Sequence, residues 1–281
     1  MGRLTRRHPV LRLTAEEERR RIDVLAVEEP LELRINGEPF VVTMRTPGDD
    51  LDLVHGLLHA EGLITGVADI GTARYCGGAG EDGENPYNQL DVALAPGVAP
   101  PEAAQRRQVL TSSACGLCGA TSIDQVLRDG RFELTDALRI DRAVIAAAPD
   151  RLRERQRTFE KTGGLHGAGL MDAAGELVCV REDVGRHNAV DKVIGWALRQ
   201  DRLPARDLAL VVSGRASFEL TQKAVLAGIA MLIAVSAPSS LAVELAERSG
   251  LTLAGFVRGG SMNVYTHPDR VLVGERSSVA Q

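Results

Sequence analysis

The amino-acid sequence predicts an α/β fold in which parallel strands alternate with helices. Residues 207–212 are almost wholly apolar, which is typical of a strand buried on both faces of a sheet. From this run towards the C-terminus, strand patterns alternate with helical patterns, as in a parallel sheet covered by helices. The strands expected in this part are 207–212, 231–235 and 252–257, and the expected helices are 188–199, 218–230 and 240–248.

The first hundred residues predict a smaller α+β unit over residues 23–100. Alternating apolar and polar residues indicate strands, and Asn36-Gly37 is typical of a two-residue hairpin turn. The acidic pair Asp49-Asp50 indicates the start of a helix. The expected strands are 23–27, 31–35, 40–44 and 89–94, and the expected helix is 51–59.

A larger domain is predicted over residues 101–270, because the loop at 95–101 is typical of a boundary. Its first elements are a long amphipathic helix at 141–161 and a strand hairpin of 165–171 with 177–182. Residues 1–22 and 271–281 are expected to be tails. Since the N-terminal tail is rich in arginine, we expect a flexible, solvent-exposed terminus there.

Composition narrows the class of protein. The chain has 281 residues, 44% hydrophobic and 25% charged, as in a soluble globular protein. No apolar run approaches the roughly 20 residues that span a bilayer, so no membrane is expected. A net charge of -5 argues against a nucleic-acid partner. Four cysteines in a chain of this length predict a reducing, cytoplasmic location.

Two of the four cysteines, Cys115 and Cys118, lie in a segment of small residues and glycines. Gly116 and Gly119 permit backbone angles that bulkier residues resist, so this segment predicts a mobile loop that carries two thiols. Such a pair is compatible with half of a metal site, with a redox site or with a carrier of persulfide sulfur.

The metal and redox interpretations are the weaker two. A structural zinc site needs four ligands, and no second pair at ligand spacing accompanies the two cysteines. His55 and His59 share a helical face without the glutamate of a zincin motif, which favours two structural histidines. The polar run 105–110 does not resemble the buried strand before a thioredoxin-type site. The residues that could still complete a zinc site in space are Cys76, Cys179, His166 and His187.

Several glycine-containing turns in the second half predict a site for an anionic, nucleotide-like ligand. Ser213-Gly214-Arg215 lies between a strand and a helix, where backbone N–H groups and the helix dipole favour phosphate. Ligands of open α/β sheets bind beyond the carboxyl ends of strands, and this turn lies there. Further candidates are His166 after Gly163-Gly164, the segment 182–188 with Arg186 and His187, and the glycine–arginine segment 255–261.

These segments together resemble the formate dehydrogenase accessory sulfurtransferases of the FdhD/NarQ family. Residues 113–119 read Ser-Ala-Cys-Gly-Leu-Cys-Gly, and residues 182–192 read Glu-Asp-Val-Gly-Arg-His-Asn-Ala-Val-Asp-Lys. The second block is the more specific, since a Cys-x-x-Cys pair alone occurs in many proteins. The other matching segments are 162–166, 213–219, 236–243, 253–256 and 263–268, in family order over residues 25–270.

The resemblance implies a fold, a reaction and partners. The fold would be a cytidine-deaminase-like three-layer α/β/α core with a smaller N-terminal unit, without the deaminase zinc site and with no other metal. Cys115 would accept persulfide sulfur from a cysteine desulfurase, with Cys118 as its partner thiol. The acceptor would be the molybdenum (or tungsten) bis-pterin guanine dinucleotide cofactor of formate dehydrogenase, and the protein would form a homodimer. The family's cofactor-binding segment falls on Phe256, Val257, Arg258, Gly259, Gly260 and Ser261.

Two alternative functions follow from the same residues. The chain could be a non-catalytic chaperone that binds the cofactor or the apo-dehydrogenase, in which case the thiols are incidental. It could also be a zinc-dependent hydrolase that uses the cysteines as ligands, which the missing ligands disfavour.

Overall fold

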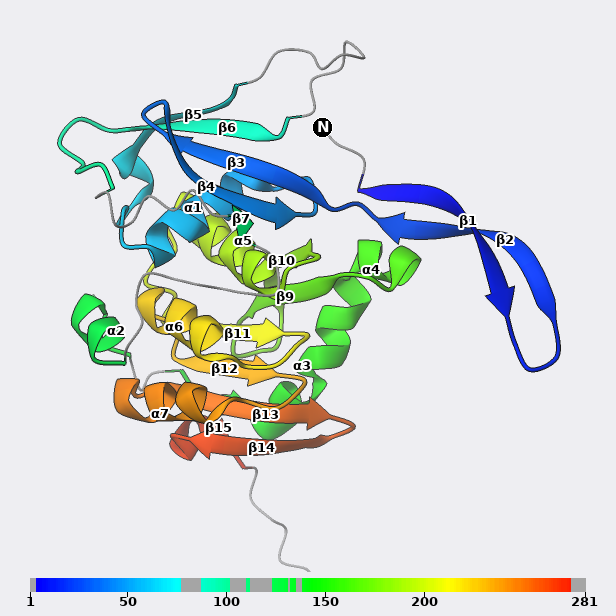
Figure 1. Cartoon of the computed structure of the whole chain (residues 1–281). Helices are drawn as coiled ribbons and strands as arrows, with labels where there is room; N and C mark the ends of the chain where they lie inside the picture. The colour runs from blue at the N-terminus through cyan, green and yellow to red at the C-terminus, as the bar shows by residue number, and fades with distance from the viewer. Residues whose placement is uncertain are drawn as a thin grey trace, which may run out of the picture.

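A computed structural model gives the fold and describes residues 4–76, 87–101, 110–111, 123–130, 132–134 and 138–273. At its centre lies a six-stranded sheet of order β10-β9-β11-β12-β13-β14 (Figure 1). Strands β11, β12 and β13 are parallel, whereas β9 is antiparallel to both β10 and β11. The bounds are β9 His166–Met171, β10 Leu177–Asp183, β11 Ala209–Val212, β12 Met231–Ala234, β13 Thr252–Arg258 and β14 Ser261–Thr266.

Helices cover both faces of this sheet and make three layers. On one face, α5 Arg186–Arg199, α6 Phe218–Leu226 and α7 Ser240–Ser249 pack over a core that includes Leu210 and Leu232. On the other face, α3 Arg142–Arg155 packs over Val211 and Ile233. Alternate residues of the same strands therefore enter opposite cores, which is why these strands are apolar throughout. The predicted α/β fold is confirmed.

The N-terminal unit has its own five-stranded sheet, of order β5-β6-β3-β4-β7. Helix α1, Asp50–Ala60, lies between this sheet and α5, and Leu53 and Leu58 of α1 belong to the unit's core. His55 and His59 are buried in α1, and His55 Nδ1 lies 2.7 Å from the Leu51 carbonyl oxygen. The strand bounds are β3 Glu29–Ile35, β4 Glu38–Arg45, β5 Ile70–Tyr75, β6 Gln89–Leu94 and β7 Leu110–Thr111.

Helices α1 and α5 pack with their backbones nearly in contact. A Cβ atom on Gly56 would overlap the carbonyl oxygen of Asp191, and one on Gly195 would overlap that of Asp52. Asp52 also accepts hydrogen bonds from Arg181 and Arg199 at 2.7 and 2.6 Å. The two units are therefore joined tightly along α5, the helix that begins within the 182–192 block.

The N-terminal residues differ from the expected tail. Strands β1 Thr5–Leu13 and β2 Glu18–Ala26 form an antiparallel hairpin that projects from the body of the protein (Figure 1). The expectation of a frayed terminus was wrong for these residues, although most of them are exposed as expected. Arginine-rich strands lack the alternation of a half-buried strand, so the sequence pattern did not reveal them.

Other differences concern element ends and short elements. The expected helix 141–161 is two helices, α3 and α4 Arg157–Thr162, with a break at Gln156. The segment 255–261 is not a simple turn, because it contains the last residues of β13, the turn Gly259-Gly260 and the first residue of β14. None of the described helices is long and apolar enough to span a lipid bilayer. The remaining elements are α2 Ile123–Asp129, β8 Ile140–Asp141, β15 Val271–Leu272 and the 3₁₀ helices Val67–Asp69 and Pro268–Arg270.

Candidate functional site

The carboxyl edge of the central sheet gathers most of the predicted site residues. Strands β10, β11 and β12 end there, and α5, α6 and α7 begin there, because each helix directly follows one of these strands. Strand β9 runs the opposite way, so its first residue, His166, lies at the same edge opposite Asp183. Three helix N-termini thus share one edge, where their N–H groups and dipoles favour an anion.

His166, Arg186 and the turn at residues 213–215 come together at this edge. His166 Nδ1 lies 3.4 Å from Ser213 Oγ, which also accepts a hydrogen bond from the Gly167 N–H. A Cβ on Gly214 would lie 3.5 Å from His166 Nδ1 and 3.9 Å from Arg186 Cδ, so the turn fits closely against both side chains. Burial and the nearby Arg186 lower the pKa of His166, so its imidazole is neutral at pH 7.

His187 is the outer member of a chain of ionisable residues that runs into the protein. Its Nε2 lies 3.3 Å from a Glu219 carboxylate oxygen, and Lys223 Nζ lies 3.8 Å from the other oxygen of Glu219. Lys223 also donates a 2.7 Å hydrogen bond to Asp191, which is almost fully buried. Burial lowers the pKa of His187 to about 4, although Glu219 opposes this shift. His187 is therefore a neutral imidazole beside a carboxylate.

The other polar residues of the 182–192 block hold the two units together. Asp183 is fully buried, and its carboxylate lies 2.8 Å from Lys192 Nζ. Lys192 donates to the Thr46 carbonyl oxygen at 2.9 Å, and the Thr46 N–H donates to Asp183 at 3.1 Å. Asn188 donates to the Met44 carbonyl oxygen at 2.8 Å. These three side chains fix the end of β4 against the start of α5, so their role is structural.

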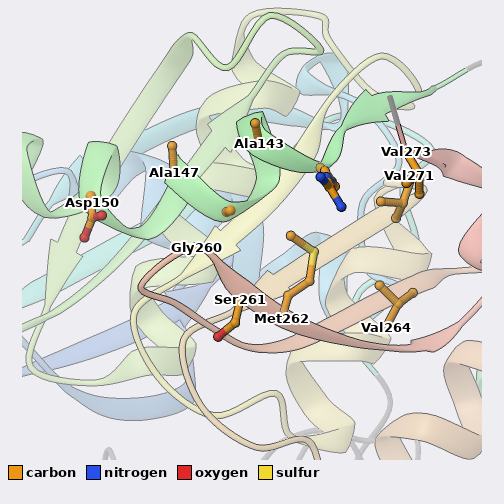
Figure 2. Close-up of a pocket in the computed structure, with 11 residues that line it drawn as sticks. Ala143, Ala147, Asp150, Gly260, Ser261, Met262, Val264, Val271 and Val273 are labelled. Atoms are coloured by element: carbon orange, nitrogen blue, oxygen red, sulfur yellow. The ribbon is translucent and has the colours of Figure 1, made fainter. Parts of the chain in front are cut away.

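The segment 256–261, expected to bind the cofactor, is divided between two places. The Phe256 N–H donates to the Ser236 carbonyl oxygen after β12, next to the carboxyl edge, and its side chain is 37% exposed. Gly260 and Ser261 instead line a groove of about 810 Å³ between α3 and β14, on the other face of the sheet (Figure 2). Arg258 is exposed at the hairpin tip between them. The segment is therefore continuous with the edge only at its Phe256 end.

The two thiols of the Cys-x-x-Cys pair, Cys115 and Cys118, lie outside the described residues. The segments that flank them are described. Before them, β7 pairs with Val42 and Thr43 of β4, and after them α2 packs on α6. Of the described cysteines, Cys179 is buried and its pKa is raised to about 12 by burial, so its thiol is inert.

Glu219 and Ser236 lie in segments that resemble the family, but the sequence did not indicate either of them as a site residue. Glu219 lies in the first turn of α6, where an acidic residue is ordinarily a favourable partner of the helix dipole. Glu219 contacts His187, which lies 32 positions earlier in the chain. No local sequence pattern predicts a contact between residues so far apart. Ser217 Oγ lies 3.5 Å from His187 Nε2 at the same place.

The low pKa of His187 predicts a pH-dependent contribution to stability. Its folded-state pKa of about 4 lies below the ordinary value of 6.5, so the unfolded chain binds the proton more tightly. This contribution to the free energy of unfolding is therefore complete above pH 6.5 and is lost as the pH falls towards 4. We expect wild type to lose about 2 kcal/mol relative to His187→Gln between pH 7 and pH 5.

Urea unfolding of both proteins at the two pH values measures this difference. The raised pKa of Asp191 has the opposite effect on stability, but it is common to both proteins and cancels in the comparison. Equal changes in the free energy of unfolding for wild type and His187→Gln would contradict the prediction.

The fold and this edge define an α/β protein whose candidate site lies at the carboxyl ends of parallel strands. The chain belongs to the FdhD/NarQ family, whose model matches residues 26–272.

The similarity to named relatives covers nearly the whole chain. It is 57% identical over 271 residues to the "Sulfur carrier protein FdhD" of Nocardia farcinica, covering 96% of each chain. It is 53% identical over 283 residues to the protein of that name from Streptomyces coelicolor, covering 100% of each. A crystal structure from Desulfotalea psychrophila, described as a formate dehydrogenase accessory protein, matches with a TM-score of 0.75 at 24% identity. The match covers 96% of this chain and 100% of that one, and it shows the fold.

Proposed function

We propose that this chain is a sulfurtransferase that carries persulfide sulfur for the maturation of formate dehydrogenase. Its donor is a cysteine desulfurase, and its acceptor substrate is the molybdenum (or tungsten) bis-pterin guanine dinucleotide cofactor. Cys115 carries the sulfur and Cys118 is the partner thiol. Membership of the FdhD/NarQ family and the names of the relatives support the proposal.

The main support for the proposal is the position of the chain just before the two thiols. Thr111 pairs with Thr43, and the Thr43 hydroxyl donates to Asn188 at 3.4 Å, one residue beyond His187. The chain therefore enters the Cys-x-x-Cys segment beside the start of α5, at the carboxyl edge. Cys115 is four residues beyond Thr111, and four residues of chain span at most about 14 Å. Its thiol can reach a ligand held at that edge.

The chemistry needs two displacements at sulfur. The Cys115 thiolate attacks the outer sulfur of the donor's persulfide, and the donor's cysteine leaves as a thiolate, so Cys115 becomes the persulfide. The Cys118 thiolate then attacks the inner sulfur of that persulfide and closes a disulfide. The outer sulfur leaves as sulfide for the acceptor, reduced by the two electrons that the thiol pair loses. A cellular thiol must reduce the disulfide before the next cycle.

The described residues at the edge fit an acceptor that carries phosphates. Arg186 has a buried Nε atom for which the described residues offer no hydrogen-bond partner, so this donor is available to a ligand. Arg215 adds an exposed cation beside the start of α6. Phe256 adopts a positive φ of 53°, a backbone strain of the kind found at binding sites, and its exposed ring can stack on a base.

A strain that lacks the gene for this protein distinguishes a sulfur carrier from a chaperone, when formate dehydrogenase activity is measured after each variant is expressed in it. We expect the Cys115→Ala, Cys118→Ala double variant to restore no activity, whereas Cys76→Ala, a partly exposed cysteine outside the pair, should restore it fully. Immunoblots must show equal protein levels. Restoration by the double variant would favour the chaperone alternative, since binding alone would then suffice.

A further inference from the structure

The β1–β2 hairpin has two chemically different faces. In the antiparallel register, directly paired residues share a face. One face carries Leu11, Leu13 and Ile22, whose exposed fractions are 50%, 67% and 59%. The other carries Arg12 opposite Arg19, with Arg21 alongside. The first face also carries Arg7, Glu18 and Arg20, and the second also carries Asp23 and Leu25. A mixed face with three exposed apolar side chains and a predominantly basic face therefore lie back to back on a ribbon that projects from the protein (Figure 1).

Exposure of both faces to water is energetically unfavourable. A two-stranded hairpin on its own is marginally stable, and an exposed apolar strand tends to associate. Directly opposed like charges such as Arg12 and Arg19 repel each other. A partner that places a carboxylate near these arginines and covers Leu13 and Ile22 would relieve both costs.

The charge balance indicates an acidic partner. Residues 4–26 hold six arginines and four acidic residues, a net charge of +2 on a chain whose net charge is -5. A lipid surface fits less well, because neither strand of the hairpin pairs with a third strand among the described residues. Its outer N–H and C=O groups would be unsatisfied in hydrocarbon, whereas a protein can pair them.

The base of the hairpin lies beside the candidate site. Helix α4 packs against β2, and a Cβ on Gly164 would lie 3.7 Å from the Cβ of Ala26. Gly164 is two residues before His166, at the carboxyl edge. A protein held by the hairpin is therefore close to the edge from which the Cys-x-x-Cys segment departs.

We propose that the β1–β2 hairpin is the docking arm for the sulfur donor, a cysteine desulfurase that holds the ribbon in a cleft with an acidic wall facing Arg12 and Arg19 and an apolar wall facing Leu13 and Ile22. This inference rests on the proposed function, which requires a donor protein to approach Cys115. The hairpin provides affinity and orientation, and the thiols provide the chemistry.

Calorimetric titration with the purified cysteine desulfurase of the same organism tests the arm. We expect Leu13→Ser, Ile22→Ser to bind about tenfold more weakly than wild type, because two exposed apolar contacts are lost. The matched control is Val67→Ser, Val273→Ser, two apolar residues exposed elsewhere, with unchanged affinity. Arg12→Glu should also bind about tenfold more weakly, most clearly at low salt, whereas Arg206→Glu should not.

Arg12→Glu also separates binding from folding. It replaces an Arg–Arg pair by a Glu–Arg pair, so the hairpin should be no less stable and weaker binding cannot be attributed to unfolding. Inorganic polysulfide, which needs no docking protein, should load Cys115 equally in wild type and in both hairpin variants.

The inference would be overturned if the hairpin variants bound the desulfurase with an affinity within twofold of wild type. It would also be overturned if light scattering showed that the hairpin variants change the oligomeric state and not the affinity for the desulfurase. A third contradicting result is that wild type binds anionic phospholipid vesicles and does not bind the desulfurase. Failure of the proposed function gives a different result, because the desulfurase would then bind wild type and transfer no sulfur to Cys115.

Discussion

Lys192→Met is expected to lower the free energy of unfolding by about 3–5 kcal/mol. Lys192 and Asp183 are 1% and 0% exposed, with 2.8 Å between their charged atoms. Without the ammonium group, Asp183 remains as a buried negative charge, and the Thr46 carbonyl oxygen loses a 2.9 Å hydrogen bond. The three N–H donors that Asp183 retains, from Thr46, Gly185 and Asn188, can offset only part of this loss.

Guanidinium unfolding measures the effect. The control is Lys161→Met, an exposed lysine on α4, which should change stability by about 0.5 kcal/mol or less. The double variant Asp183→Asn, Lys192→Met should cost less than the sum of its single changes, because no unpaired charge remains. A loss below about 1 kcal/mol in Lys192→Met would show that the ion pair does not join the two units.

Gly195→Ala is expected to destabilise the protein by about 3 kcal/mol or more. The new methyl group would overlap the Asp52 carbonyl oxygen, which belongs to the backbone of α1 and cannot rotate away. The two helices must then separate, which disturbs the packing of α5 against α1. Since α5 begins with Arg186 and His187, sulfur transfer should fall together with stability.

Gly66→Ala is the matched control. Gly66 has a φ of -151°, which any residue adopts, and a Cβ there would meet nothing within 4 Å. We expect this variant to keep wild-type stability or to gain a few tenths of a kcal/mol from a less flexible unfolded chain. Similar thermal midpoints for Gly195→Ala and Gly66→Ala would refute the close contact between α1 and α5.

The sequence predicted the part of the fold that depends on local patterns. The apolar run at 207–212 contains the buried strand β11, which begins at Ala209, and the expected helix 51–59 is α1 with one more residue at each end. The candidate residues His166, Arg186, Ser213 and Arg215 share one edge because all of them lie next to strand ends there.

What the sequence did not predict depends on contacts between distant residues. The break in the expected helix 141–161 is stabilised by Glu182, whose carboxylate accepts the N–H groups of Thr158 and Phe159 at the start of α4. A cap supplied from another strand leaves no local signal. For the same reason, the sequence could not tell that Asp183 and Lys192 join the two units while the neighbouring Arg186 and His187 belong to the candidate site.

The central claim, that Cys115 carries the sulfur, is tested most directly by intact mass spectrometry after incubation with the cysteine desulfurase and cysteine. Cys118→Ala should gain the mass of one sulfur atom, removable by a reducing thiol, because it keeps the attacking thiolate and lacks the thiol that would displace the sulfur. Cys115→Ala should gain none. A gain of one sulfur atom by Cys115→Ala would contradict the account, since another group would then carry the sulfur.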